Sequence, residues 1–130
     1  MRLSLGIDLV SVDCVAESIV RHSERYLERV YTDGELADCR DAGGAPVPER
    51  LASRFAAKEA LMKALRPGDD AIPWRQIAVR SDRFGAPALE LCGRAQAVAE
   101  RRGVRSLALS MTHEGSFAAA VVVAEIGDGR

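Results

Sequence analysis

The first ten residues alternate between large apolar side chains and small or polar ones, which is the pattern of a β-strand. The apolar face consists of Leu3, Leu5, Ile7 and Leu9. The other face carries Ser4, Gly6 and Asp8. We therefore predict a half-buried strand over residues 2–10 with its leucine-rich face in the core. The missing side chain of Gly6 leaves room for another segment to approach the backbone beside Asp8.

Helical patterns dominate the next part of the chain. Residues 11–41 form a polar, interrupted helical region, in which Thr32 and Asp33 have the composition of a helix N-cap. Residues 42–48 contain two glycines and two prolines and predict a flexible connection. The strongest helical signal runs from Pro48 to Leu65, and Pro67-Gly68 ends it.

The second half of the chain predicts four strands and one helix. Two short alternating segments, at 77–79 and 89–91, flank a turn at 84–87. Residues 93–103 predict a helix that ends at a glycine, and residues 104–113 and 117–126 predict two strands around a second turn. The uninterrupted apolar run from Ala118 to Ala124 predicts burial on both faces of the last strand. Residues 127–130 predict a loose C-terminal tail, which leaves one α+β domain over residues 1–126.

Composition narrows the class of protein. With 130 residues, 48% of them apolar and 28% charged, the chain is typical of one water-soluble domain. Aromatic residues make up only 5%, so we expect a core of Ala, Val and Leu and a ligand site that draws on a second subunit. A net charge of −1 argues against a nucleic-acid or membrane partner, and the absence of a signal or spanning segment predicts a cytoplasmic protein. The three cysteines, at 14, 39 and 92, lack the spacing of a zinc site or a disulfide framework.

The charges of the predicted central helix lie among apolar residues. Between Leu51 and Leu65 the charged side chains are Arg54, Lys58, Glu59 and Lys63. All the others are Leu, Ala, Ser, Phe or Met, so no broad polar face remains and we expect burial nearly all round. At about 100° per residue Lys58 falls within the apolar stripe, while Glu59 and Lys63 share a neighbouring face. Because an unpaired buried charge costs several kcal/mol, these side chains need partners or a ligand.

Two interpretations of these charges stay open on the helix alone. In the first, Glu59 and Lys63 form an ordinary ion pair four residues apart, and Lys58 and Arg54 extend to water. In the second, the four charges surround a ligand. Asp8 favours the ligand interpretation, because it supplies a second carboxylate beside Glu59. Mg²⁺ characteristically takes one or two carboxylates and completes its shell with water and phosphate oxygens. Asp8 and Glu59 would hold such a cation beside a diphosphate.

Four motifs together resemble the holo-acyl-carrier-protein synthase family. They are Gly6-Ile7-Asp8-Leu9-Val10, the helix segment Arg54–Ala60 with Lys63-Ala64-Leu65, the turn Gly85-x-Pro87, and Ser110-Met111-Thr112-His113. They follow the family's order and spacing over nearly the whole chain. The resemblance implies the 4′-phosphopantetheinyl transferase fold, a small antiparallel sheet packed around a long central helix, and a subunit that assembles as a trimer.

The resemblance also implies a reaction and the residues that perform it. Members of this family transfer the 4′-phosphopantetheine group of coenzyme A to a serine of an apo acyl carrier protein, in fatty-acid or polyketide biosynthesis, and release 3′,5′-ADP. Asp8 and Glu59 match the magnesium ligands. Arg54, Lys58, Lys63 and His113 match the residues that contact the coenzyme, and Glu59, Lys63 and His113 are the catalytic candidates. On position alone, a histidine that merely satisfies the backbone of its turn is an equal alternative for His113.

The group that removes the serine proton stays open between Glu59, a metal-bound water and another carboxylate. Glu35 is the other carboxylate, within a family-like pattern from Tyr31 to Glu35. For Glu35 a simple charge in the first turn of a helix is the favoured interpretation.

Carrier proteins of this class are acidic, so the resemblance implies a basic docking patch. Arg21, Arg25 and Arg29 recur every four residues and are the candidates, although a solvated helix face explains them nearly as well. The chain departs from the family at Cys14, where an arginine is usual, and at Leu65-Arg66-Pro67-Gly68, where Leu-Gly-x-Gly is usual. The first departure suggests an unusual carrier, and the second suggests different contacts to the adenosine of the coenzyme.

Three other functions compete with this one. A non-catalytic subunit that binds coenzyme A or a nucleotide predicts a missing carboxylate. A small acyl-CoA thioesterase of similar length predicts its main helix early in the chain, before an extended sheet. A purely structural trimer predicts that the charges of the central helix form a network between subunits.

Overall fold

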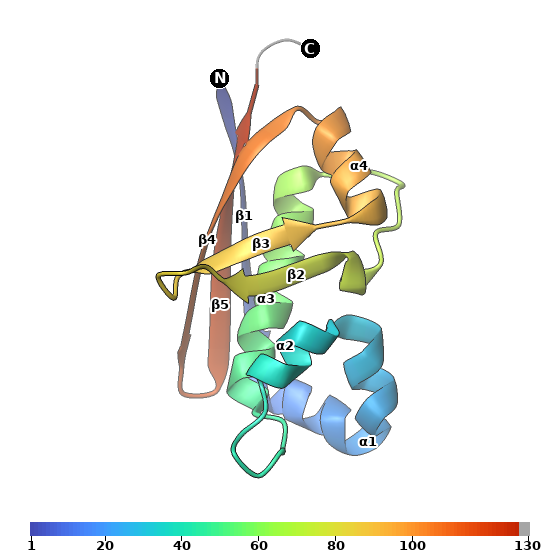
Figure 1. Ribbon diagram of the computed structural model, residues 1–130, viewed down its shortest axis with the longest axis vertical. Coiled ribbons are helices and arrows are strands. Elements are labelled where there is room, and N and C mark those ends of the chain that lie inside the picture. Colours follow the sequence, from blue (N-terminus) through green and yellow to red (C-terminus); the bar gives the residue numbers. More distant parts are fainter. Residues whose placement is uncertain (128–130) are drawn as a thin grey trace.

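The computed structural model describes residues 1–127, and its central feature is one long helix enclosed by the rest of the chain (Figure 1). The elements run β1 (Arg2–Ser11), α1 (Val12–Val30), α2 (Asp33–Asp38), α3 (Pro48–Leu65), a 3₁₀ turn (Trp74–Gln76), β2 (Ile77–Ser81), β3 (Pro87–Leu91), α4 (Gly93–Arg101), β4 (Val104–Glu114) and β5 (Phe117–Ile126). The α3 helix lies between a three-stranded sheet and the β2–β3 hairpin, with α1 and α2 at one end and α4 at the other. The predicted α+β class is confirmed.

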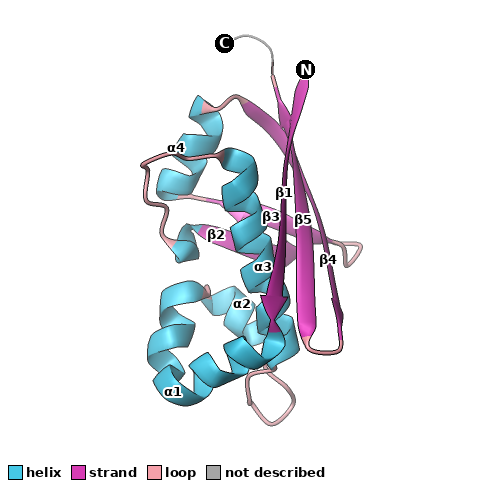
Figure 2. Cartoon of the chain, turned by 180° about the vertical axis from the view of Figure 1, so that it is seen from behind, coloured by secondary structure: helices cyan, strands magenta, loops and turns pink. Residues whose placement is uncertain are grey.

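Both sheets are antiparallel. The larger one has the order β1-β5-β4, and β2 pairs only with β3. Figure 2 shows α3 along one face of the larger sheet, whereas no helix from residues 1–127 covers the opposite face. In the register of this sheet Asp8 lies opposite Ala120, and Val10 lies opposite Ala118. The sheet therefore has an inner face against α3 and an outer face.

The predicted bounds and burial of α3 are confirmed. Pro48 occupies the first turn, where its missing N–H is not needed, and ten of the eighteen residues are buried. Five of the buried residues are alanines, whose small side chains let neighbouring elements approach from every side. The helix ends at Arg66, which has a left-handed backbone with φ of 50°. That conformation favours glycine, so the arginine is strained there.

The orientation of β1 is the reverse of the prediction. Its large apolar residues Leu3, Leu5, Ile7 and Leu9 lie on the outer face and are between 58% and 67% exposed. The small side chains face α3 because the helix backbone comes too close for anything larger. A side chain at Gly6 would lie 1.8 Å from the carbonyl oxygen of Ala60. Ser4 Oγ donates to the carbonyl oxygen of Ala64 at 2.7 Å.

The last strand is buried on one face only. Ala118, Ala120, Val122, Ala124 and Ile126 are buried on the inner face. The residues between them are half-buried or exposed, so the predicted burial on both faces is wrong for the single chain. The reason is that the second face of β5 continues the uncovered outer face of β1. The outer face is thus an apolar surface formed by β1 and β5.

The helical region before α3 is interrupted as predicted. The α1 helix contains one residue outside the helical conformation, Ser23, with φ of 47° and ψ of −127°. Thr32 caps α2: its hydroxyl accepts from the N–H of Glu35, and the carboxylate of Glu35 accepts from the N–H of Thr32. The predicted N-cap is therefore confirmed.

The remaining predictions mostly hold. The hairpin, α4 and the β4–β5 pair lie where they were predicted, and α4 is followed by Gly103 with φ of 79°. Gly127 is tied down, because its N–H donates to the carbonyl of Gly103 at 2.8 Å. The rest of the predicted loose tail, residues 128–130, lies outside the described residues. Over residues 1–127, no helix has the length and apolar character to cross a membrane. The three cysteines are free.

Candidate active site

Asp8 and Lys63, far apart in the sequence, meet where β1 passes α3. Lys63 Nζ donates to Asp8 Oδ1 at 3.2 Å and to the carbonyl oxygen of Ile7 at 2.9 Å. Glu59 lies one turn before Lys63 on α3. The predicted convergence of Asp8, Glu59 and Lys63 is therefore present, and Lys63 forms an ion pair with the carboxylate on the neighbouring strand. We call these three residues the carboxylate cluster.

The electrostatics of the carboxylate cluster favour a cation. Burial raises the pKa of Glu59 above its ordinary value of 4.5, and the Asp8 carboxylate raises it further, whereas Lys63 lowers it. Two carboxylates that repel each other are stabilised when a divalent ion binds between them. No group of three or more His, Cys, Asp or Glu side chains suited to a metal exists within residues 1–127. Two carboxylates match the protein ligand set of Mg²⁺, which completes its shell with water and phosphate oxygens.

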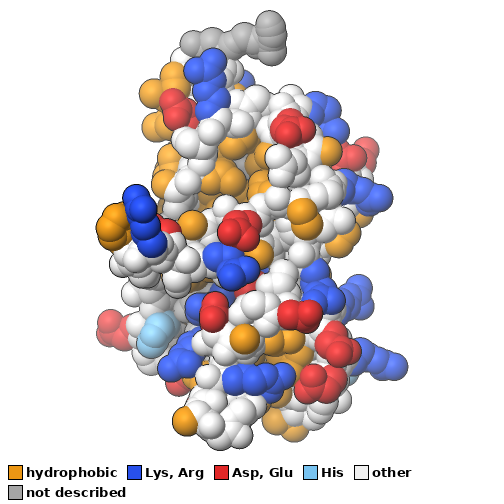
Figure 3. All heavy atoms as spheres, in the orientation of Figure 1, with side chains coloured by type: hydrophobic (Ala, Val, Ile, Leu, Met, Phe, Trp, Pro, Cys, Tyr) orange, Lys and Arg blue, Asp and Glu red, His pale blue; other side chains and the backbone are white. Residues whose placement is uncertain are grey.

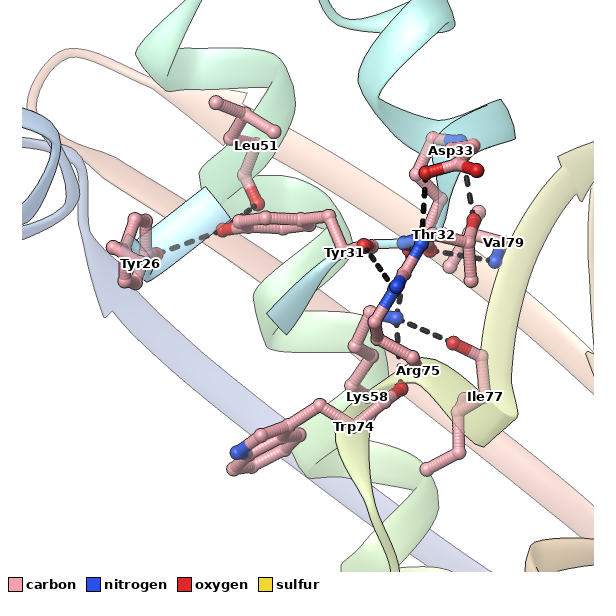
Figure 4. Close-up of polar contacts among 11 residues, drawn as sticks. Tyr26, Tyr31, Thr32, Asp33, Leu51, Lys58, Trp74, Arg75, Ile77 and Val79 are labelled. Atoms are coloured by element: carbon pink, nitrogen blue, oxygen red, sulfur yellow. Dashed lines mark hydrogen bonds and ion pairs between the residues drawn. The ribbon is translucent and has the colours of Figure 1, made fainter. Parts of the chain in front are cut away.

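Lys58 does not lie beside this cluster, and the expectation that it would is wrong. Figure 4 shows its side chain turned toward the 3₁₀ turn and β2. Its Nζ contacts Glu35 Oε1 at 2.7 Å, the carbonyl of Trp74 at 3.1 Å and the carbonyl of Ile77. An ammonium group has three donors, so none remains for a phosphate. The side chains of Lys58 and Glu35 are both fully buried.

Glu35 is a structural carboxylate rather than a base. Besides Lys58, it accepts from the N–H of Thr32 at 2.9 Å and from the N–H of Val79 at 2.8 Å. Glu35 does lie in the first turn of α2, as the favoured interpretation states. Its ion pair with Lys58 was not predicted from the sequence. Two features of the sequence could have indicated this ion pair: the Thr-x-x-Glu capping pattern, which orients Glu35, and the position of Lys58 inside an apolar stripe.

Arg54 lies on another side of α3 from the carboxylate cluster. Its Nη1 donates to the carbonyl of Arg50 at 3.3 Å, and its Nε is buried without a partner among residues 1–127. It lies near Cys39, where its charge partly offsets the burial that raises the pKa of that thiol to about 11. A phosphate role for Arg54 stays a prediction.

His113 is separated from the cluster by a strand. It is exposed near the end of β4 and pairs with Ala118 of β5, which in turn pairs with Val10 of β1. Two strand spacings amount to about 10 Å, so His113 and Asp8 are not in direct contact.

The carrier-docking candidates are exposed, but they do not form one helical stripe. Arg21, Arg25 and Arg29 all lie on the surface of α1. Ser23 breaks the helix between the first two, so the spacing of four aligns only Arg25 and Arg29.

Comparisons with known proteins agree with one another. A family model described as the 4′-phosphopantetheinyl transferase superfamily matches residues 4–122. The holo-[acyl-carrier-protein] synthase of Halothermothrix orenii is 40% identical over 123 residues, which is 95% of this chain and 97% of that protein. The enzyme of the same name from Solibacter usitatus is 40% identical over 126 residues, 96% of this chain and 99% of that protein.

Solved structures show the same fold. An ACPS–CoA complex from Chronobacterium ammoniagenes superposes with a TM-score of 0.84 at 30% identity, over 98% of this chain and 100% of that one. The holo-[acyl-carrier-protein] synthase of Helicobacter pylori, solved with coenzyme A, has a TM-score of 0.80 at 30% identity, over 93% and 99% of the two chains.

Proposed function

This chain belongs to the 4′-phosphopantetheinyl transferase superfamily, and we propose that its carboxylate cluster is the active site of a holo-acyl-carrier-protein synthase. The enzyme transfers the 4′-phosphopantetheine group of coenzyme A to a serine of an apo acyl carrier protein. The observation that carries the assignment of the site is the meeting of Asp8 and Glu59 beside Lys63. The pathway served, fatty-acid or polyketide biosynthesis, and the cytoplasmic location stay predictions from the sequence.

Asp8 and Glu59 would hold the cation. A magnesium ion held by these two residues would supply positive charge to the diphosphate of coenzyme A. Lys63 already donates to Asp8 and is 56% exposed, so its side chain is free to turn one of its donors toward a phosphate oxygen. Its positive charge then stabilises the negative charge that develops on the transferred group.

The chemical step forms one bond and breaks one bond at the β-phosphorus atom. The serine oxygen of the carrier attacks phosphorus, the bond to the 3′,5′-ADP oxygen breaks, and the serine proton passes to a base. Glu35 is unsuited to this role, because its oxygens are taken by Lys58 and by two backbone N–H groups. Glu59 is the remaining carboxylate candidate, beside a water bound to the metal.

A trimer is the assembly that we propose for this subunit. The outer face carries exposed Leu3, Leu5, Ile7 and Leu9, and Phe117 is 52% exposed at its edge. Exposed apolar rows of this extent mark an interface, and copies of this chain are the occupant that the family resemblance implies. In the proposed trimer the ligand site lies between subunits, as the family resemblance implies.

Docking of an acidic carrier onto α1 is part of the proposal. Exposed arginines support it, and Arg25 and Arg29 share one face of the second helical segment. A solvated helix face is the alternative explanation of these arginines, and charge reversal of Arg25 and Arg29 distinguishes it from docking. If the carrier docks there, charge reversal should raise KM for the carrier without changing KM for coenzyme A.

The competing functions are each opposed by a particular feature. A non-catalytic subunit would not need both carboxylates, and both are present. The thioesterase expectation places the main helix early, whereas α3 lies in mid-chain between strands. The structural-trimer interpretation loses support because Lys58 is satisfied within one chain.

Transfer to an apo carrier tests the function directly. Purified enzyme, Mg²⁺ and coenzyme A should add about 340 Da to the carrier, the mass of the transferred group. Asp8→Ala and Glu59→Ala should abolish the gain while leaving the oligomer intact. No gain with fatty-acid, polyketide and peptidyl carriers, under conditions where a control enzyme works, would defeat the proposal.

A further inference from the structure

Lys63 joins the central helix to the strand that carries Asp8. Its Nζ donates to Asp8 Oδ1 at 3.2 Å and to the carbonyl oxygen of Ile7 at 2.9 Å. These two acceptors belong to adjacent residues of β1, so they hold the ammonium group in one place, on a carboxylate that is a proposed metal ligand. An ammonium group has three donors, and one therefore remains for water or for a ligand.

The two partners of this ion pair differ in their exposure to solvent. The side chain of Asp8 is only 15% exposed, whereas the side chain of Lys63 is 56% exposed. The carboxylate is therefore fixed within the fold, and the ammonium is the partner that can leave. Lys58, the only other lysine of the chain, is buried with Glu35 and cannot take its place.

The positive charge of Lys63 acts on both carboxylates of the cluster. It pairs directly with Asp8. Burial and the Asp8 carboxylate raise the pKa of Glu59, and the Lys63 ammonium lowers it. A divalent cation that approaches Asp8 and Glu59 meets this positive charge, and like charges repel. Lys63 therefore opposes a cation that arrives alone.

A diphosphate reverses this effect. Its oxygens attract the ammonium of Lys63, and the exposed side chain is able to turn from Asp8 toward them. Once it has turned, the ammonium no longer occupies the carboxylate. In the same way, a cation at Asp8 releases the ammonium to a phosphate. Both ligands thus favour the same position of the Lys63 side chain, which is the condition for positive coupling between two binding events.

We propose that Lys63 couples magnesium binding to coenzyme binding, because it holds Asp8 until a diphosphate attracts it away. The proposal rests on the proposed function and deepens it, since it names a control over the loading of that site. The coupling through Lys63 cannot exceed the free energy of the contact that is released. A partly exposed ion pair limits it to about fivefold, the equivalent of about 1 kcal/mol.

Calorimetric titrations of magnesium chloride and of coenzyme A, each alone and each with the other present, test the coupling without any carrier protein. Lys63→Met removes the charge and keeps a long side chain. We expect this variant to bind magnesium alone about fivefold more tightly than wild type does. The factor by which each ligand strengthens the binding of the other should fall by about the same amount. A lysine that acted only on the coenzyme would leave the affinity for magnesium alone unchanged.

Lys63→Arg and Arg101→Gln are the matched controls. Lys63→Arg keeps a positive charge beside Asp8 and should bind magnesium alone as wild type does. Arg101→Gln removes an exposed charge that pairs with Asp70 on another part of the surface. Basic and acidic side chains are interspersed over the face of the molecule in Figure 3, so the loss of one such charge should change magnesium affinity little.

Three results would overturn the coupling. One is a Lys63→Met protein that binds magnesium alone with wild-type or weaker affinity. The others are equal tightening in Lys63→Arg and equal tightening in Arg101→Gln, because a charge beside Asp8 would then not be the cause. Failure of the proposed function is distinguishable. It would appear as wild type that transfers nothing to any carrier, whereas the titrations with magnesium alone would still report on Lys63 and Asp8.

Discussion

Glu59 occupies a position where an ionised carboxylate is costly without a cation. Burial and the nearby Asp8 raise its pKa above 4.5, so the unfolded chain loses this proton more readily than the folded chain does. The stabilising contribution of protonated Glu59 is fully present below pH 4.5 and is lost as pH rises through the raised pKa. At neutral pH the metal-free fold therefore carries a destabilising charge that Mg²⁺ would offset.

Replacing Glu59 by Gln should separate these effects. In EDTA at pH 7 we expect Glu59→Gln to melt a few degrees above wild type, because the buried charge is gone. Wild type should gain about 2.7 kcal/mol at a magnesium concentration 100 times Kd, and the variant should gain almost nothing. Thermal melts with and without Mg²⁺ measure the difference in melting temperature and the stabilisation by magnesium. Equal magnesium shifts in the two proteins would exclude Glu59 as a ligand.

Activity should depend on pH through the same carboxylate. As pH falls through the raised pKa of Glu59, protonation removes a magnesium ligand, and kcat/KM for coenzyme A should fall. Excess Mg²⁺ should move the midpoint to lower pH, because the cation competes with the proton. A midpoint that does not respond to magnesium concentration would contradict this prediction.

The buried pair of Lys58 and Glu35 makes a stability prediction at the same scale. Glu35→Gln leaves the ammonium of Lys58 in the core without a charged partner, which costs about 3 to 5 kcal/mol. Asp33→Asn is the control on the same helix, since Asp33 is 95% exposed in its pair with Arg75. An exposed pair contributes about 1 kcal/mol or less. Urea denaturation measures the free energy of unfolding of both variants. Equal losses of stability in Glu35→Gln and Asp33→Asn would argue against a stabilising role of the buried pair.

At the scale of elements, the contact between β1 and α3 positions the site. Gly6 and Ser4 let the strand lie against the helix backbone, and this approach brings Asp8 to Lys63. The 3₁₀ turn before the hairpin contacts α4 through a side chain. Gln76 Oε1 accepts from the N–H groups of Arg94 and Ala95, which caps α4 from a distant segment.

Gly6→Ala tests the contact. Its new methyl group would lie 1.8 Å from the carbonyl oxygen of Ala60, so β1 must move away from α3. We expect a loss of about 3 kcal/mol, the upper end for overpacking, and a fall in transfer as Asp8 shifts. Gly43→Ala is the control, because its nearest neighbour would be 3.5 Å away, and its stability should change little. Full activity and stability in Gly6→Ala would contradict the account.

At the scale of the whole molecule, the outer face decides whether the single chain is the working unit. Its leucine-rich row is exposed, and His113 lies two strands from Asp8. Both features are explained if copies of the chain pack through this face and complete one another's sites.

Leu5→Glu should break that assembly. A charge on the outer face is costly to bury against another copy, so light scattering should show the variant at the 14.0 kDa mass of one chain and wild type at three times that mass. Transfer should fall with the assembly. Val20→Glu changes a more exposed apolar residue, on α1, and should leave the mass unchanged. A wild type that stays a single chain at micromolar concentration would contradict the proposed trimer.

The sequence by itself determined the features that depend on near neighbours along the chain. The bounds of α3, the cap at Thr32, the hairpin and the last two strands follow from local periodicity and from turn or capping residues, which act within a few positions. The meeting of Asp8 with the α3 charges was also predicted, from charges that lie among apolar residues and from the resemblance to a known family.

Only the tertiary structure decided which face of β1 enters the core and which charge meets which. Alternation defines two faces without saying which one a helix will cover, and here the close approach of the α3 backbone selects the small side chains. Likewise, the position of Lys58 on its helix indicates only that its charge needs a partner. Which partner it finds depends on α2 and β2, which fold against the helix and supply Glu35 and the carbonyl of Ile77. These outcomes depend on contacts between segments that are distant in sequence, and local patterns do not encode those contacts.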